Sequence, residues 1–348
     1  MSYKSSLPCL KVISVAVFML FFHFSTAQNL GNLDAVVAMK QKQLKTDVII
    51  MVANKDTVVY QKDTKTFSAL RGQAPIGNSS QWLTTALVMM LVDEGKITLD
   101  DRISYYLPEF GKYGKNYITI RHCLSNKTGI QSEGAKFKKA LEKKKFESLE
   151  KEVNSFAAKE IQRNPGEEFR YNTMGINIAA RVLEVVTKKK FDMLSQQKLF
   201  RPMGMRQTTF TTLDASAIDA SDGARSTAGD LIGFMTMLLN GGMYKGQRIL
   251  KEESVKELRK IHESASLNNA PAEVNGFQYA LGAWAPEQQG NEASVLTAPS
   301  YGGTITVIDF CRGYAFVYFL KELKDDQRAN AYNDIKGLLD EKFSNKCK

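Results

Sequence analysis

The chain has 348 residues, and its 47 basic and 37 acidic side chains give a formal charge of +10. This length exceeds one typical domain, so we expect one large domain or two lobes. The sequence contains no repeat period and no low-complexity linker, which argues against a repeat array.

The first 27 residues have the anatomy of a secretory signal peptide. Lys4 and Lys11 are basic, residues 12–24 are almost wholly apolar, and residues 25–27 are small. The apolar run is short for a membrane span, and a retained N-terminal anchor is the alternative. No later stretch approaches that length. We therefore predict an exported chain, periplasmic or secreted, with no transmembrane segment after cleavage.

Removal of the leader leaves 45 basic and 37 acidic residues, a formal charge of +8. Much of the excess lies in residues 136–145 (KFKKALEKKK). This segment is either a patch for an anionic glycan, a lipid headgroup or nucleic acid, or the solvated face of a helix. We favour the solvated face, because few aromatic residues interleave the lysines. No nucleic-acid partner is predicted for an exported chain.

Three cysteines follow the leader, namely Cys123, Cys311 and Cys347. Cys123 and Cys311 lie in apolar segments and are predicted to be buried thiols. An odd number at wide spacings argues against a disulfide framework. His122 and His262 stand apart from each other and from any cysteine or carboxylate cluster, so the sequence predicts no metal and no cofactor.

Hydrophobic periodicity predicts strands near both chain ends and helices between them. Leu33, Val36, Val37 and Leu44 recur at helical spacing, and residues 48–53 and 57–61 form a hairpin pattern. Further predicted helices cover residues 81–95, 137–161, 175–188, 191–200, 228–239 and 326–343. Further predicted strands cover residues 277–284, 304–308 and 314–320.

This order predicts an α/β plus all-α fold. Residues 28–75 and 245–348 would form an antiparallel sheet flanked by helices, and residues 76–244 a mostly helical lobe inserted between its halves. The two lobes would belong to one domain overall. A ligand would bind in the cleft between them.

Six segments stand in a characteristic order along nearly the whole mature chain. They are residues 86–110, 118–130, 165–171, 202–205, 226–250 and 300–308. Each is a weak match alone, but the ordered set is specific. It resembles the β-lactamase-related, penicillin-binding-protein-like serine hydrolases, which include class C β-lactamases, DD-peptidases and esterases. The resemblance implies a β-lactamase/transpeptidase-like fold and acyl-enzyme chemistry.

That family's chemistry requires a serine and a lysine three residues apart at the start of a buried helix. This spacing puts both groups on one helix face, where a desolvated lysine can help to deprotonate the serine. In the matching segment, Asn78 stands at the serine position and Gln81 at the lysine position. An amide is neither a nucleophile nor a base at neutral pH. The resemblance therefore predicts a pseudoenzyme with no intact catalytic pair.

Two further family motifs complete the predicted ligand cleft. In the Tyr-x-Asn motif, Tyr171 is retained and Thr173 replaces the asparagine. Tyr171 would either donate a hydrogen bond to a ligand or only anchor its loop. The strand motif, usually Lys-Thr-Gly or His-x-Gly, has no basic residue here, although its backbone could help to form an oxyanion hole. It consists of Ser300, Tyr301, Gly302 and Gly303.

The sequence leaves three functions open. An inactive member would bind a peptide, a cell-wall fragment or a protein through the cleft. An active esterase, peptidase or β-lactamase-like hydrolase would need Ser79 or Ser80 as a displaced nucleophile. Such a shift rotates the side chain by about 100° to 200° around the helix, away from the cleft. A purely structural or adhesive domain is the third possibility.

Overall fold

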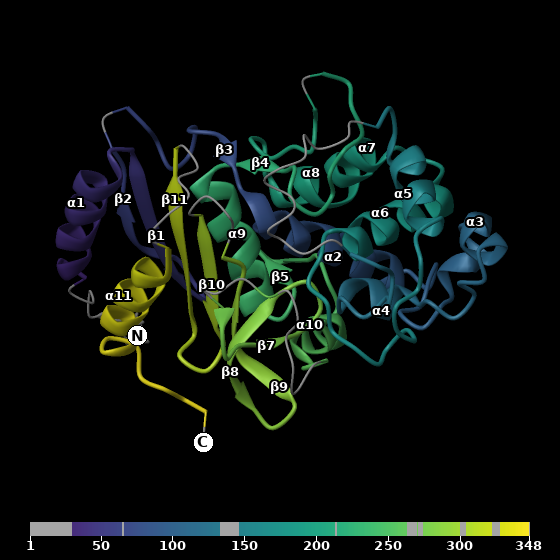
Figure 1. Cartoon of the computed structure of the whole chain (residues 1–348). Coiled ribbons are helices and arrows are strands. Elements are labelled where there is room, and N and C mark those ends of the chain that lie inside the picture. The colour runs from purple at the N-terminus through teal and green to yellow at the C-terminus, as the bar shows by residue number, and fades with distance from the viewer. Residues whose placement is uncertain are drawn as a thin grey trace, which may run out of the picture.

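The computed structural model describes residues 30–64, 66–132, 146–212, 214–262, 270, 274–299, 304–321 and 328–347 (Figure 1). The predicted leader, the whole basic segment 136–145 and the candidate cleft residues 300–303 lie outside these ranges. Within them, no helix is both long and apolar enough to cross a membrane.

The chain alternates between one large sheet and the helices that cover it. The helices are α1 (Asn32–Leu44), η1 (Gly77–Ser79), α2 (Ser80–Asp93), η2 (Ile103–Tyr105), α3 (Pro108–Lys112), α4 (Ile120–Leu124), α5 (Leu149–Ala157), α6 (Met174–Thr187), α7 (Phe191–Ser195), η4 (Gln196–Phe200), α8 (Arg201–Met203), α9 (Ala228–Leu239), α10 (Glu252–Arg259) and α11 (Arg328–Asp340). The strands are β1 (Val48–Asn54), β2 (Val58–Lys62), β3 (Ala74–Pro75), β4 (Arg225–Ser226), β5 (Met243–Tyr244), β6 (Gln247–Arg248), β7 (Gln278–Tyr279), β8 (Trp284–Gln289), β9 (Glu292–Thr297), β10 (Ile305–Asp309) and β11 (Tyr314–Leu320).

Both ends of the chain contribute to the seven-stranded antiparallel sheet, whose order is β2-β1-β11-β10-β9-β8-β7. β1 pairs with β11 along its full length, from Val48 opposite Leu320 to Asn54 opposite Tyr314. This pairing confirms the predicted antiparallel sheet from both chain ends, flanked by helices.

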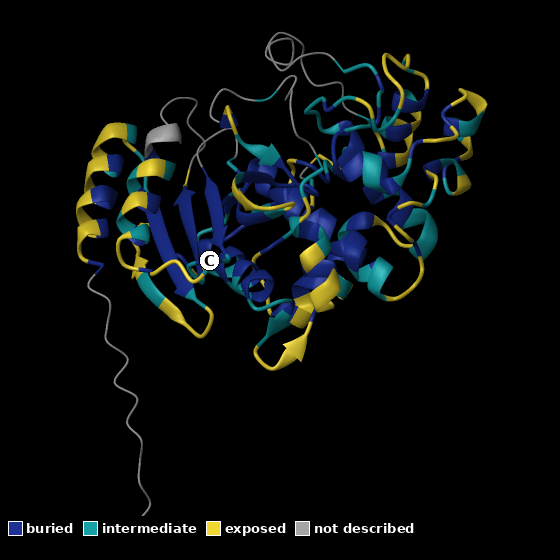
Figure 2. Ribbon diagram, turned by 90° about the horizontal axis from the view of Figure 1, so that it is seen from below, coloured by how far each residue is buried: buried dark blue, intermediate teal, exposed yellow. Residues whose placement is uncertain are grey.

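Helices cover both faces of the central strands. Along β1, Ile50 and Val52 pack in one cluster with residues of α1 and α11, whereas Ile49 and Met51 pack in another with residues of α9 (Figure 1). Successive side chains of a strand point to opposite faces, so burial on both faces explains the unbroken apolar run of β1. Figure 2 shows the central strands buried and exposed residues gathered on the outer helices and hairpins.

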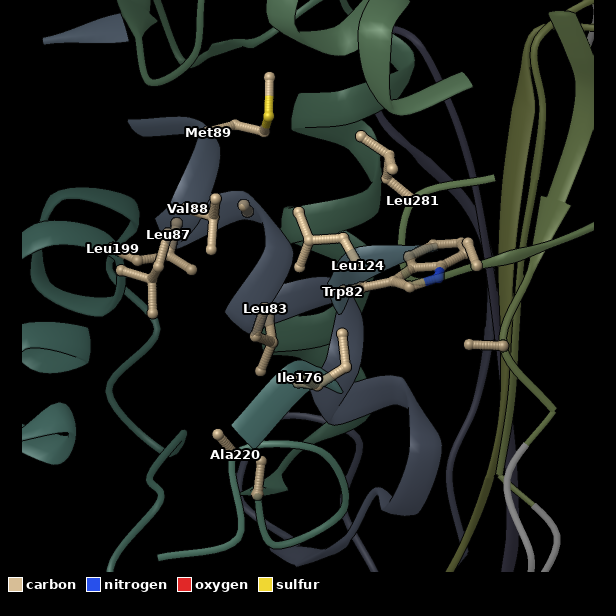
Figure 3. Packing of buried hydrophobic residues seen from close by; sticks show 14 of the residues in the cluster. Trp82, Leu83, Leu87, Val88, Met89, Leu124, Ile176, Leu199, Ala220 and Leu281 are labelled. Carbon is tan, nitrogen blue, oxygen red and sulfur yellow. The ribbon is translucent and has the colours of Figure 1, made fainter. Parts of the chain in front are cut away.

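α2 runs through the interior, with 11 of its 14 residues buried. Figure 3 shows its Leu83 and Leu87 among apolar side chains from other segments, including Ile176 of α6, Leu199 of η4 and Ala220. A helix that is buried nearly all round belongs to the core, so its position is fixed by packing on every side. The start of α2 is therefore held rigidly within the molecule.

Most of the predicted elements are confirmed, and two are wrong. Only residues 149–157 of the described part of the predicted helix 137–161 are helical, as α5. The predicted single strand 277–284 is a hairpin instead, because the chain turns between β7 and β8, where Gly282 adopts a φ of +69°. β9 was not predicted at all. The proposed division into lobes at residues 76 and 244 stays a prediction; α9, placed in the helical lobe, packs against β1, β10 and β11.

The prediction that Cys311 is a free buried thiol is wrong. Cys311, in the turn after β10, forms a disulfide with Cys347, whereas Cys123 is free and buried as predicted. The two bonded cysteines are 36 residues apart in the sequence. They meet because α11 returns the C-terminal segment to the end of β10, and their spacing alone does not reveal this path.

A buried ion-pair network lies beside this disulfide. Lys336 Nζ of α11 is 2.7 Å from an Asp340 oxygen and 3.3 Å from an Asp309 oxygen, and Arg312 is 3.1 Å from Asp309. Asp309 is fully buried at the end of β10. Paired charges of this kind satisfy one another away from water, so the network and the disulfide together fix α11 to the sheet.

Candidate functional site

The short helix η1 and the first turn of α2 hold the two amide residues of the candidate site, Asn78 and Gln81. Gly77, at a φ of +53°, leads into the short helix η1, and both amides are buried, with Asn78 6% and Gln81 1% exposed. Asn78 Nδ2 donates to the carbonyl of Pro299, at 3.4 Å. Pro299 immediately precedes candidate residue Ser300, so the start of α2 lies against the segment that follows β9.

The amide of Gln81 bridges two tyrosine hydroxyls. Its Nε2 donates to the Tyr171 hydroxyl at 3.0 Å, and its Oε1 accepts from the Tyr279 hydroxyl at 3.2 Å. Burial raises the pKa of Tyr279 well above its ordinary value, so this hydroxyl stays protonated and can donate. The structure thus brings together the predicted residues Gln81 and Tyr171, with both ends of the amide satisfied.

An aromatic cluster surrounds this bridge. The ring centroids of Tyr279 and Trp284 are 4.8 Å apart, those of Tyr171 and Trp284 5.1 Å, and those of Phe169 and Tyr279 5.0 Å. Tilted and edge-on pairs at these distances add to the stabilisation from burial. The sequence alone does not reveal Tyr279 and Trp284 as site residues, because both fall in one predicted strand and the pattern does not show which helix they face.

Asn126 holds the segment that carries Tyr171. Its backbone has a φ of +58°, a left-handed conformation that asparagine tolerates better than most residues. Its Oδ1 accepts from the Asn172 amide at 3.0 Å, and its carbonyl accepts from the Arg170 amide at 2.9 Å. The predicted cleft residue Thr173 follows as the half-buried N-cap of α6. Asn126 is therefore a positioning residue for Tyr171.

The serines beside Asn78 are engaged in the fold. Ser79 Oγ donates to the Ala298 carbonyl at 3.2 Å and lies 3.2 Å from Thr306 Oγ1. Ser80 Oγ accepts from the Ala224 amide at 3.0 Å. Both serines are 2% exposed or less.

Gly282 allows the turn between Tyr279 and Trp284 to pack on α2. A Cβ at this residue would lie 2.3 Å from Thr85 Oγ1, and the φ of +69° disfavours any other residue. We expect Gly282→Ala to lower the free energy of unfolding by about 3 kcal/mol, through backbone strain and overpacking. Gly290→Ala is the matched control, because Gly290 has a φ of +57° but open space around it. It should cost only about 1 kcal/mol. If both variants lose the same free energy of unfolding in urea, the close packing of Gly282 on α2 contributes nothing to stability.

The histidines are less isolated than their sequence positions suggest. The charge of Asp100 acts on both His122 and His262, and Glu257 also lies within electrostatic reach of His262. These carboxylates act singly, and among the residues that the structure describes no group of three or more histidine, cysteine or acidic side chains could hold a metal ion. The His262 amide donates to the Tyr279 carbonyl at 2.9 Å, which places this histidine next to the candidate site.

His262 makes the protein sensitive to acid. Burial, reinforced by the positive charge of Arg121 and opposed by Glu257, lowers its pKa to about 4, with Lys127 and Lys260 also disfavouring the charge. The unfolded chain takes up a proton near pH 6.5 and the folded chain only near 4, so stability is full above pH 6.5 and declines between these values. Between pH 7.5 and 4.5, wild type should lose about 2 kcal/mol more than His262→Gln in urea unfolding. Parallel losses in the two proteins would contradict this assignment.

Comparison with known proteins gives one consistent family. The family model "Beta-lactamase" matches residues 38–339. "Protein flp" of Staphylococcus aureus (strain MW2) is 26% identical over 160 residues, which cover 45% of this chain and 32% of that protein. The chain therefore matches only about a third of the length of this curated relative.

Solved structures share the fold. A crystal structure from Bacteroides dorei DSM 17855, described as a "putative beta-lactamase", has a TM-score of 0.78 at 21% identity and covers 89% of this chain and 98% of that chain. The octameric penicillin-binding protein homologue from Pyrococcus abyssi has a TM-score of 0.70 at 17% identity, covering 89% and 78%. The architecture is thus the β-lactamase/transpeptidase fold, and the chain belongs to the beta-lactamase family.

Proposed function

We propose that this chain is an exported member of the beta-lactamase family that has lost acyl-transfer chemistry and binds a ligand in the former active-site cleft. The observation that carries the proposal is the bridge from Gln81 to Tyr171 and Tyr279. A neutral amide, with both ends hydrogen-bonded, occupies the position where the family places its lysine.

The amides at Asn78 and Gln81 remove the chemistry and preserve the packing. An asparagine amide does not attack a carbonyl, and a glutamine amide accepts no proton from a hydroxyl. In serine proteases, loss of the nucleophile alone lowers turnover on the order of 10⁶-fold. The hydrogen bonds of both amides support a cleft that stays ordered without acting as a catalyst.

A displaced nucleophile receives no support from the geometry. The hydroxyls of Ser79 and Ser80 are buried and hydrogen-bonded to backbone groups outside α2. The residues three positions further along are Trp82 and Leu83, and neither is a base. An active hydrolase with either serine would have to break these contacts first.

Export is supported by two independent features. The sequence begins with a leader of the signal-peptide type, and Cys311 is bonded to Cys347. Disulfides persist in oxidising compartments such as the periplasm or the outside of the cell. We therefore propose a periplasmic or secreted location, where a peptide, a cell-wall fragment or another protein would be the ligand.

Calorimetry with a pentapeptide ending in D-alanyl-D-alanine tests this proposal. We expect reversible binding and no hydrolysis product by mass spectrometry. Tyr171→Phe should weaken binding about five- to tenfold, because one hydroxyl is lost. Tyr113→Phe, at an exposed tyrosine after α3, is the matched control and should bind as wild type does. Equal affinities of the two variants would place the ligand elsewhere, and product formation by wild type would make the chain an enzyme.

A further inference from the structure

A concave site lies at the opposite end of α2 from Asn78. The α10 cavity has a volume of about 370 Å³ and is lined by residues of the β1–β2 turn, the C-terminal end of α9, and α10. At the start of α10, the Lys251 amide donates to Asp93, the last residue of α2, at 2.7 Å. Fourteen residues of helix span about 20 Å, so this cavity is separate from the candidate cleft.

Positive charge dominates the α10 cavity. Four cationic side chains line it, together with a single carboxylate from Glu252; the four are Lys55, Arg248, Lys256 and Arg259. Two carboxylates next to the cavity also act on these cations: Glu292 is 3.4 Å from Arg259, and Glu253 acts on Lys256. Three negative charges therefore stand against four positive ones, and the balance stays positive.

The existing contacts leave part of this positive charge uncompensated. Lys256 is 3.0 Å from Glu252, whereas the guanidinium of Arg248 donates to the carbonyls of Gly241 and Leu250, each at 3.0 Å. Carbonyl acceptors satisfy hydrogen bonds but bring no full negative charge. A concave site lined mainly by charges of one sign raises the local potential, so a small anion is attracted into the cavity.

The positive charge of Arg259, at the wall of the cavity, is also only partly compensated. Its guanidinium stacks on the Phe310 ring, with 4.3 Å between the guanidinium carbon and the ring centroid, and its Nε donates to the Ala293 carbonyl at 3.0 Å. Burial lowers the pKa of Arg259, and the charge of Glu292 only partly opposes this shift. A guanidinium fixed by stacking and by one backbone bond is pre-organised to bind a further acceptor.

We propose that the α10 cavity binds a phosphate group, carried either by a soluble phosphoester or by a lipid headgroup. The negative charge of a phosphate group complements the positive excess, and its oxygens suit the forked donors of two arginines.

A larger cavity on the helical side of the molecule provides the contrast. The α6 cavity, of about 640 Å³, is lined by as many acidic as basic side chains. Its basic residues are Arg181, Lys188, Lys189 and Lys190, and its acidic residues are Glu147, Glu150, Glu184 and Asp192. Because its charges balance, we expect no anion site there, and its lysines provide a matched control.

Calorimetric titration with pyrophosphate at constant ionic strength tests the proposal. Wild type should bind one pyrophosphate per chain, and Lys55→Gln/Lys256→Gln should bind it at least tenfold more weakly. Both lysines are exposed, so the double variant should fold, which its melting temperature checks. The control, Lys188→Gln/Lys190→Gln in the α6 cavity, should bind as wild type does. No binding by wild type, or equal weakening in both double variants, would overturn the site.

Sedimentation with phosphatidylcholine vesicles containing phosphatidylglycerol distinguishes the two sources. If the ligand is a lipid headgroup, wild type binds the vesicles, pyrophosphate displaces it, and only Lys55→Gln/Lys256→Gln loses binding. If the ligand is a soluble phosphoester, pyrophosphate binds and the vesicles do not. Vesicle binding that survives both saturating pyrophosphate and the double substitution would contradict phosphate recognition in this cavity.

Discussion

Asn78→Ser/Gln81→Lys is expected to form an acyl-enzyme with an activated ester faster than wild type, by a factor on the order of 10³ or more. The rate rises because the double variant recovers both the nucleophile and the base. The serine restores a nucleophile at the start of α2, where the helix dipole favours developing negative charge. The lysine would place its amine near the hydroxyls of Tyr171 and Tyr279, the present partners of Gln81. Desolvation there lowers the pKa of a lysine toward the range of a useful base.

The single substitutions separate restored chemistry from a general change in the cleft. Asn78→Ser lacks the base and Gln81→Lys lacks the nucleophile, so each should remain near the wild-type rate. Groups that act as a unit give strongly non-additive effects, which is the signature to look for in stopped-flow acylation rates. If the double variant folds but acylates no faster than the two single variants, the cleft has lost more than these two side chains.

Breaking the disulfide should produce the largest loss of stability. In the chain-entropy account, a cross-link that closes a loop of 36 residues stabilises the fold by about 3–4 kcal/mol. Cys347→Ser should lower the free energy of urea unfolding by that amount. It also detaches the segment after α11 from the turn that follows β10.

Reductant provides the internal control for this prediction. Reduced wild type should match Cys347→Ser, whereas Cys347→Ser itself should not respond to reductant. Alkylation and mass spectrometry of protein taken directly from its native compartment should find Cys311 and Cys347 oxidised and Cys123 free. Reduced Cys311 and Cys347 in freshly isolated protein would contradict the proposed export.

Much of the fold could be predicted from local patterns. The unbroken apolar run of β1 predicts a strand that is buried on both faces, as the structure has it. The prediction for α9 (Ala228–Leu239) has the observed bounds. The segment 277–284 was misread because the turn depends on Gly282, whose φ and close approach to Thr85 are tertiary properties. The predicted segment does contain strand residues, but the prediction lacks the turn that divides it between β7 and β8.

The candidate site could be predicted only in part, because spacing in the sequence reveals local motifs but not contacts between distant segments. Asn78, Gln81 and Tyr171 belong to motifs whose spacing is visible in the sequence. The partner Tyr279 comes from a hairpin almost 200 residues away from Gln81, and no spacing rule connects them. The bond between Cys311 and Cys347 was missed because a count of cysteines does not show where α11 brings the chain.

Intact-mass spectrometry of the wild-type protein tests the central claim most directly. The mature protein would be incubated with a reactive β-lactam and, separately, with an activated ester, beside Asn78→Ser/Gln81→Lys. We expect the wild-type mass to stay unchanged and the double variant to gain one acyl group. A stoichiometric adduct on wild type, mapped to Ser79, Ser80 or another serine or threonine of the cleft, would contradict the loss of acyl-transfer chemistry.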